Sequence, residues 1–140
     1  MHSDDLLAPT LRELAAAIAR HLPQGTVSRA AASTLSVLRL EGAQRITVLA
    51  EREAVSQPAM TNLVQRLEAQ GLVTRAADPA DARATLISVT EAGVRVIDER
   101  RRLQDDALRA TLARLSPEDH DALVAALPAL AHVTELHESR

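Results

Sequence analysis

Apolar residues recur at intervals of three and four along almost the whole chain, and one segment, which follows Gly71, interrupts this period. Such spacing places apolar side chains on one face of a helix, so most of the chain is predicted to be helical. The segment from Leu72 to Thr90 is instead rich in β-branched residues, which suit strands. The pattern therefore predicts a mainly α fold with one small β-hairpin.

The composition is typical of one globular domain. The chain has 140 residues, of which 46% are hydrophobic and 25% charged, enough for a single core. It has no Phe, Trp, Tyr or Cys. This argues against reading single-stranded nucleic acid by aromatic stacking, and against thiol chemistry or a cysteine zinc site. Without a long apolar run or a basic leader, we expect a cytoplasmic protein with no membrane partner.

The first predicted helix has two possible starts. Pro9 would lie inside a helix that begins at Asp4 or Asp5, whereas Thr10 and Glu13 would form a capping box for a later start. In either case the helix ends near the stretch HLPQG. Its buried stripe is predicted to comprise Leu7, Leu11, Leu14, Ile18 and Leu22.

Capping residues delimit the next three helices. A second helix is predicted from residue 28 to residue 40, and Gly42 ends it. Thr47 can cap a short third helix, VLAERE, and Ser56 can cap a fourth that stops at Gly71. Because only about three residues separate the third and fourth helices, they are predicted to form a helix-turn-helix.

The fourth helix has one apolar and one polar face. The apolar positions follow the i, i+3, i+4, i+7 rule and are Met60, Leu63, Val64 and Leu67. The opposite face carries Gln57, Thr61, Asn62, Gln65 and Arg66. Gln and Asn can pair with adenine in the major groove, and Thr can meet a thymine methyl group or a phosphate. This helix is therefore predicted to read bases, with Ser56 and Gln57 near a phosphate at its N-terminus.

A hairpin and two further helices complete the prediction. The strands LVTR and ATLISVT flank AADPADAR, whose Asp-Pro and polar cluster indicate a turn. Thr90 can cap a long helix from Glu91 to about Leu115. The last helix would begin with Ser116 as its cap and Pro117 as its first residue.

The segment from Ile46 to Gly93 resembles the winged helix-turn-helix of the MarR family of bacterial transcription regulators. The resemblance rests on the stretch TVLAEREAVSQPAMTNLVQRLEAQGLVTR, on the wing DPADARATLISVTEAG, and on the flanking helices. The family pattern is Asp-x-Arg followed by hydrophobic-Thr-x-x-Gly, and it is matched by Asp81, Arg83, Val89, Thr90 and Gly93. The helical order extends the resemblance over almost the whole chain.

The resemblance implies a winged helix-turn-helix with N- and C-terminal dimerisation helices. Residues 1–140 would form a single MarR-like domain, with a helical dimerisation region at 1–42 and 91–140 and a DNA-binding lobe at 43–90. It further implies that Arg83 enters the minor groove, that Asp81 orients it, and that Arg75 touches a backbone phosphate. A planar Arg suits narrow, A/T-rich minor grooves.

One recognition helix reads only a few base pairs, so we expect a homodimer that places two on a near-palindromic operator in double-stranded DNA. The alternative, that the apolar stripes of the terminal helices only fill the core of a monomer, holds for some of them. The predicted dimerisation residues are Leu7, Leu11, Leu14 and Ile18 in the first helix, Leu108, Leu112 and Leu115 in the fifth, and Leu123, Leu127 and Leu130 in the last.

The resemblance also implies a repressor that a small phenolic or anionic effector releases from DNA. The effector would lie between the dimerisation helices and the lobe, and would bind the DNA-incompetent state better than the competent one. Arg20, His21 and Arg39 are candidate anion contacts, and the pocket would be aliphatic because the chain has no aromatic residues. The run Arg100–Arg102 lies mid-helix, where we expect a solvated or intersubunit role.

Charge is the main objection to a DNA-binding function. From Arg45 to Arg83 the chain carries five arginines and five acids, so binding must depend on where the arginines lie. One alternative is a winged-helix module for protein contacts without DNA binding, and another is a metal-responsive regulator that uses some of the five histidines. No catalytic motif is present, so we expect neither an enzyme nor a cofactor.

Overall fold

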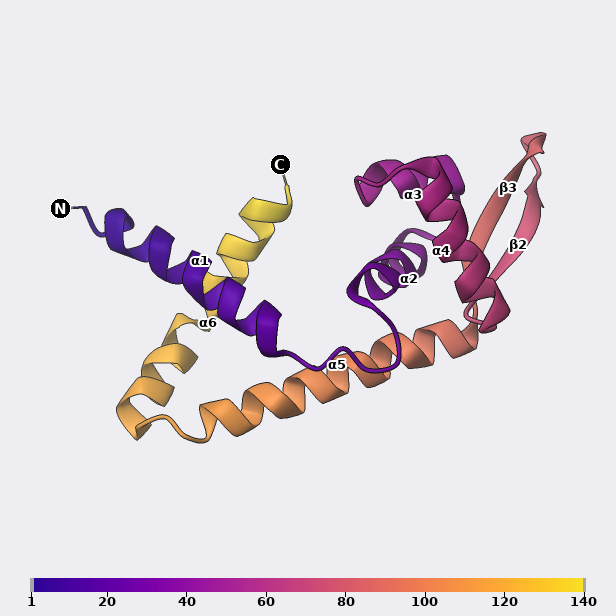
Figure 1. Cartoon of the computed structure of the whole chain (residues 1–140). Coiled ribbons are helices and arrows are strands. Elements are labelled where there is room, and N and C mark those ends of the chain that lie inside the picture. Colours follow the sequence, from indigo (N-terminus) through magenta and orange to yellow (C-terminus); the bar gives the residue numbers. More distant parts are fainter. Residues whose placement is uncertain (1, 140) are drawn as a thin grey trace. The chain divides into compact units, whose positions relative to one another are not determined.

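The computed structural model describes residues 2–139 and is mainly helical (Figure 1). The predicted fold class, helices with a small β-hairpin, is confirmed. By contacts the chain divides into two compact units, one ending at Gln104 and the other beginning at Asp105. None of the described helices is both long and apolar enough to cross a membrane. The elements in chain order are α1 (Asp4–His21), α2 (Arg29–Glu41), β1 (Gln44–Arg45), α3 (Ile46–Arg52), α4 (Gln57–Ala69), β2 (Val73–Asp78), β3 (Asp81–Val89), α5 (Glu91–Leu112) and α6 (Pro117–Glu138).

The core lies where α2, α3 and α4 pack with the sheet and the start of α5. Its apolar residues come from the helical stripes that the sequence period predicts, with strands adding Val73 and Ile87. Because α2 contributes to this core, the lobe that contains the helix-turn-helix extends beyond residues 43–90. The fully buried apolar side chains are Leu35, Leu38, Leu49, Met60, Val64, Leu67, Val73, Ile87 and Ile97.

Serine caps begin three of the helices, and two of them, Ser56 and Ser116, are predicted from the sequence. The hydroxyl oxygens of Ser28, Ser56 and Ser116 each accept a hydrogen bond from the backbone N–H three residues later, at 3.1 to 3.2 Å. The prediction of Thr47 as the cap of α3 is wrong, because α3 already begins at Ile46. Arg45, the residue before the helix, has an extended backbone that pairs with β3. This pairing fixes the start of α3.

The start of α1 is the earlier of the two alternatives. The helix begins at Asp4 and includes Pro9. Thr10 does not cap it; its hydroxyl donates to the Leu6 carbonyl oxygen at 2.8 Å within the helix. A proline one turn into a helix removes one backbone hydrogen bond, and here the helix continues through it.

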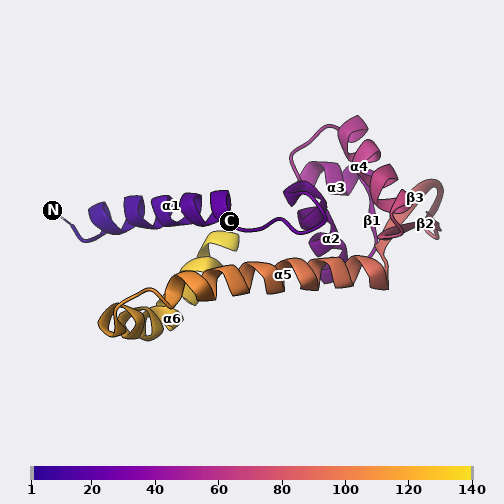
Figure 2. The same cartoon turned by 60° about the horizontal axis from the view of Figure 1, so that its bottom comes forward.

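The sheet has three antiparallel strands in the order β1-β3-β2 (Figure 2). The sequence did not indicate β1, a two-residue strand that pairs with Leu86 and Ile87 of β3. The predicted wing turn is too long: strands occupy most of AADPADAR, and only Pro79 and Ala80 lie between β2 and β3. The β2–β3 register shifts between Ala77 and Asp78, just before this turn.

A compact junction joins α4, the wing and α5. Gly71 has φ of +73°, which turns the chain out of α4 at little steric cost. The Thr90 hydroxyl donates to the Gly71 carbonyl oxygen at 2.7 Å and accepts from the Gly93 N–H at 3.1 Å. Gly93 is packed so closely that a Cβ there would lie 2.7 Å from Val89 Cγ2. The predicted Thr90 cap is confirmed, and it ties α5 to the end of α4.

Candidate nucleic-acid interface

Helix α4 presents the polar surface that the sequence predicts. Its four apolar residues are buried, whereas Thr61 is half-buried. The exposed residues on the other side include Gln57, Asn62, Gln65 and Arg66. The helix therefore offers amide groups and one guanidinium to a partner while its aliphatic face holds the lobe together.

Few backbone N–H groups in the first turn of α4 are free to bind an anion. The Ser56 hydroxyl accepts the Ala59 N–H at 3.2 Å, and Pro58 has no N–H to give. The N–H of Gln57 is therefore the one left in the first turn for an anion. Ser56 itself is engaged as a cap.

The wing tip is organised by carboxylates that bind backbone. Asp81 Oδ1 accepts from the Arg83 N–H at 3.0 Å, and Asp78 Oδ1 accepts from the Ala80 N–H at 2.9 Å. Asp81 and Arg83 are both exposed. Asp81 thus acts on the backbone at Arg83, and the Arg83 side chain extends into solvent.

Arg75 is paired inside the lobe. Its Nε lies 3.2 Å from Oε2 of Glu68 on α4, and 28% of its side chain is exposed. Its Nη2 is buried and makes no hydrogen bond to the described residues. The structure thus gives Arg75 a role in joining β2 to α4, beside the phosphate contact that the family resemblance implies.

A second ion pair, which the sequence did not indicate, crosses the sheet. Arg45 Nη2 and Nε lie 2.6 and 2.8 Å from Oδ2 of Asp78, whose side chain is only 9% exposed. The hydrogen bond from Ala80 and then the guanidinium of Arg45 lower the pKa of Asp78 below its ordinary value. These residues are 33 positions apart, so no local pattern could reveal the pair.

These contacts show which arginines of the lobe are already paired. Arg45 and Arg75 are neutralised by Asp78 and Glu68, and Arg52 pairs with Glu41 of α2 through two hydrogen bonds. Within the described part of residues 43–90, the arginines left without a carboxylate partner are Arg66 on α4 and Arg83 on the wing. The neutral count thus includes two free cations on the elements proposed to meet DNA, and three acids, Glu51, Glu53 and Asp81, without an arginine partner among the described residues.

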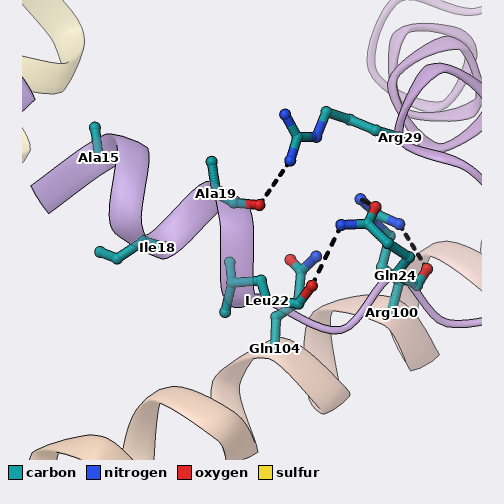
Figure 3. Close-up of a pocket in the computed structure, with 8 residues that line it drawn as sticks. All are labelled: Ala15, Ile18, Ala19, Leu22, Gln24, Arg29, Arg100 and Gln104. Atoms are coloured by element: carbon teal, nitrogen blue, oxygen red, sulfur yellow. Dashed lines mark hydrogen bonds between the residues drawn. The ribbon is translucent and has the colours of Figure 1, made fainter. Parts of the chain in front are cut away.

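A cavity of about 440 Å³ lies between α1, the α1–α2 connection and α5 (Figure 3). Its apolar wall is formed by Ala15, Ile18, Ala19 and Leu22, and its polar side by Gln24, Arg29, Arg100 and Gln104. The predicted anion contacts are not brought together here: Arg20, His21 and Arg39 are absent from its lining, and Arg39 donates to Asp98 at 2.6 Å. Sequence reasoning missed Arg29 and Arg100, which no helical period distinguishes from other arginines.

Arg100 is buried, so the expectation that the Arg100–Arg102 run is solvated or intersubunit is wrong for this residue, whereas Arg101 and Arg102 are exposed. The Arg100 guanidinium donates to the Gln24 and Val27 carbonyl oxygens at 2.6 and 3.2 Å, and to Gln24 Oε1 at 2.7 Å. Burial, and then the nearby charge of Arg29, lower the pKa of Arg100 below its ordinary value. Arg29 donates to the Ala19 carbonyl oxygen at 2.7 Å, and no Asp or Glu is among the described residues that line the cavity.

The predicted dimerisation helices carry exposed leucines. Among the described residues, neither α1 nor α6 has a buried residue. Leu11, Ile18 and Leu108 are partly buried. The large apolar residues that remain exposed on these helices, at the end of α5 and in the α5–α6 connection are Leu6, Leu7, Leu14, Leu112, Leu115, Leu123, Val124, Leu127, Leu130, Val133 and Leu136.

Within residues 2–139, no three His, Asp or Glu side chains are grouped so as to hold a metal ion. The metal-responsive alternative therefore gains no candidate site from the structure.

Comparison with known proteins finds relatives that are transcriptional regulators. The model of the MarR family matches residues 27–85. A transcriptional regulator of the helix-turn-helix type from Mycobacterium tuberculosis is 35% identical over 127 residues, which cover 88% of this chain and 89% of that protein. The transcriptional repressor NicR of Pseudomonas putida is 35% identical over 65 residues, 46% of this chain and 41% of NicR. The crystal structure of the transcriptional regulator Tm0710 from Thermotoga maritima aligns with a TM-score of 0.79 and 26% identity, over 97% of this chain and 99% of that one.

Proposed function

Because the chain belongs to the MarR family of transcriptional regulators, we propose that it binds specific sequences of double-stranded DNA through α4 and the wing. The observation that carries this proposal is the distribution of free groups on the lobe. The exposed amides of α4 and the unpaired guanidiniums of Arg66 and Arg83 lie on the elements that a winged helix presents to the two grooves. The other arginines of residues 43–90 are held by carboxylates.

Selection of random duplex DNA on the purified protein tests the proposal. Enriched sequences are then titrated by fluorescence anisotropy at two salt concentrations. We expect an enriched motif and a modest salt dependence, because few arginines are free to displace counterions. A lack of enrichment at low salt would instead favour the winged-helix module that makes only protein contacts.

The amides of α4 should read individual base pairs. We expect Asn62→Ala to relax the preference at particular positions of the selected site, by roughly 1 to 3 kcal/mol for a bidentate contact. Gln57→Ala should relax a different position. Both side chains are exposed, so folding should be unaffected. The measurement is a repeat of the selection with each variant; an equal loss of affinity on every sequence would mean that the residue touches only phosphate.

We propose that the binding species is a homodimer on a near-palindromic site. The support is the apolar surface of α6, a helix of 22 residues that buries none of them in the isolated chain. A soluble protein rarely leaves so many large apolar side chains in water, so a second copy is the natural cover. Two-fold symmetry would then place the two recognition helices about one turn of DNA apart.

We further propose that the protein is a repressor and that a small organic anion releases it. The cavity beside Arg29 and Arg100 supports this, because two neighbouring guanidiniums without a carboxylate favour a negative charge. Its aliphatic wall would hold the apolar part of the ligand. The ligand would act by binding better to the arrangement that does not fit DNA.

Arg29→Gln tests the anion site. With salicylate as a phenolic probe and octanoate as an aliphatic one, we expect at least one to raise the melting temperature and to lower the affinity for the selected duplex. Arg29 is exposed, so the variant should fold, while the response to the probe should fall by about tenfold or more with loss of a charge-assisted contact. Arg12→Gln, an exposed arginine outside the cavity lining, is the control. An equal response in both variants would argue against this site.

A further inference from the structure

Arg45 is a cation that the proposed DNA contacts do not use. It lies on the edge strand β1, where it pairs with Leu86 of β3, and Asp78 ends β2 on the far side of β3. Two of its nitrogens nevertheless reach Asp78 Oδ2, at 2.6 and 2.8 Å. The guanidinium thus connects the two outer strands of the sheet across the central one.

The two oxygens of Asp78 have different partners. Oδ2 accepts from Arg45, and Oδ1 accepts from the Ala80 N–H in the turn. The carboxylate is nearly buried, whereas 41% of the Arg45 side chain is exposed. A charge-assisted pair shielded on one side in this way is stronger than an ordinary surface pair. Asp78 therefore couples the β1 edge of the lobe to the turn of the wing.

This coupling lies where the hairpin is least regular. The β2–β3 register shifts immediately before Asp78, and irregular pairing increases the local twist and bending of a hairpin. Beyond that point Pro79 and Ala80 form the turn, and Asp81 accepts the Arg83 N–H. Arg83 follows Asp78 by five residues, on the other side of this turn.

We propose that Arg45 is a positioning residue for the wing: by holding Asp78 it fixes where Arg83 points relative to α4. The inference rests on the proposed function, because it assumes that α4 and Arg83 meet the same DNA. A wing fixed in advance avoids the entropy cost of ordering its tip on binding. The Glu68–Arg75 pair, at 3.2 Å, adds a link from the recognition helix α4 to strand β2 of the wing.

The first test needs no DNA. Amide hydrogen exchange of the full chain is compared between the native protein and Arg45→Gln. We expect faster exchange at Ala80 and Arg83 and unchanged exchange in α4, because the variant loosens only the wing. If Arg45→Gln fails to fold, Asp78→Asn carries the same test, since its amide oxygen still accepts from Ala80 while the charge that holds Arg45 is gone. Unchanged exchange at the wing tip overturns the proposal.

The second test is a double-mutant cycle on the selected duplex. We expect Arg45→Gln to weaken binding by about five- to tenfold in the native background and by less than about twofold in the Arg83→Ala background. Arg45→Lys should fall between, because a single ammonium cannot make both bonds to Asp78. Arg102→Gln, which removes an arginine paired with Glu99 on an exposed part of α5, is the matched control for loss of one charge.

The two tests separate the possible failures. An equal loss of affinity in both backgrounds overturns the proposal, because it means that Arg45 touches DNA itself or supports the lobe as a whole. If the native protein selects no duplex, the proposed function fails on its own, and the exchange of the Ala80 and Arg83 amides still decides whether Arg45 holds the wing.

Discussion

Leu127→Glu should convert the protein to a monomer and reduce its affinity for the selected operator by about a thousandfold, toward the level of non-specific binding. Leu127 is 59% exposed in the isolated chain, so the monomer loses little when it is replaced. In a dimer joined through α6, the glutamate would be buried without a partner, which is costly. The affinity falls steeply because a monomer holds only one half-site.

Analytical ultracentrifugation and anisotropy titration give the two readouts. Leu127→Met keeps an apolar side chain of similar volume and should remain a dimer that binds DNA. As a folding control, the circular dichroism spectrum and the melting temperature of the lobe should be the same in both variants. These are measured at a protein concentration where the native protein is monomeric. A Leu127→Glu protein that remains a dimer would show that this part of α6 faces solvent, and the interface would then have to be sought on α1.

The fold was predictable where one local rule decides it. The caps Ser56, Ser116 and Thr90 and the glycines Gly42 and Gly71 mark the ends of elements through contacts within a few residues, and the structure has them as predicted. The apolar period of α4 likewise separates its buried and exposed faces. These signals are local in the chain, so sequence alone carries them.

The errors arise where distant residues override a local preference. Thr47 has the chemistry of a cap, but pairing of Arg45 with β3 starts α3 at Ile46, two residues before the start that a Thr47 cap would give. The polar stretch of the wing indicates a long turn, but the Arg45–Asp78 pair and the ladder extend the strands into it. Arg100 has the charge of a surface residue, yet carbonyl groups from a segment more than 70 positions away satisfy it.

The candidate site also has a part that the local sequence predicts and a part that depends on distant residues. The polar residues of α4 follow from its period, whereas the cavity beside Arg29 and Arg100 depends on how α1 and its connection to α2 lie against α5. Three plausible cations were predicted for it, and none lines it. Charge counting failed for a related reason, because a sum of charges does not reveal which arginines are already paired.

Arg83→Ala should weaken binding to the selected duplex by at least about thirtyfold, because a dimer loses two arginine contacts, each worth roughly 1 to 3 kcal/mol. The Arg83 side chain is exposed and makes no ion pair within the described residues, so the melting temperature should not change. The slope of log affinity against log salt should fall by about two for the dimer. The loss should be greatest for sites with A/T-rich flanks, whose narrow minor groove attracts arginine.

Arg83→Lys separates shape from charge. The ammonium keeps the salt dependence but lacks the planar guanidinium that fits a narrow groove, so we expect intermediate affinity and a weaker preference for A/T flanks. Anisotropy titrations on paired duplexes that differ only in their flanks measure both effects. If Arg83→Ala binds as tightly as the native protein on both duplexes, the wing does not meet DNA, and specificity would rest on α4 alone. In that case the links through Asp78 and Glu68 would stabilise the lobe without orienting a reader of the minor groove.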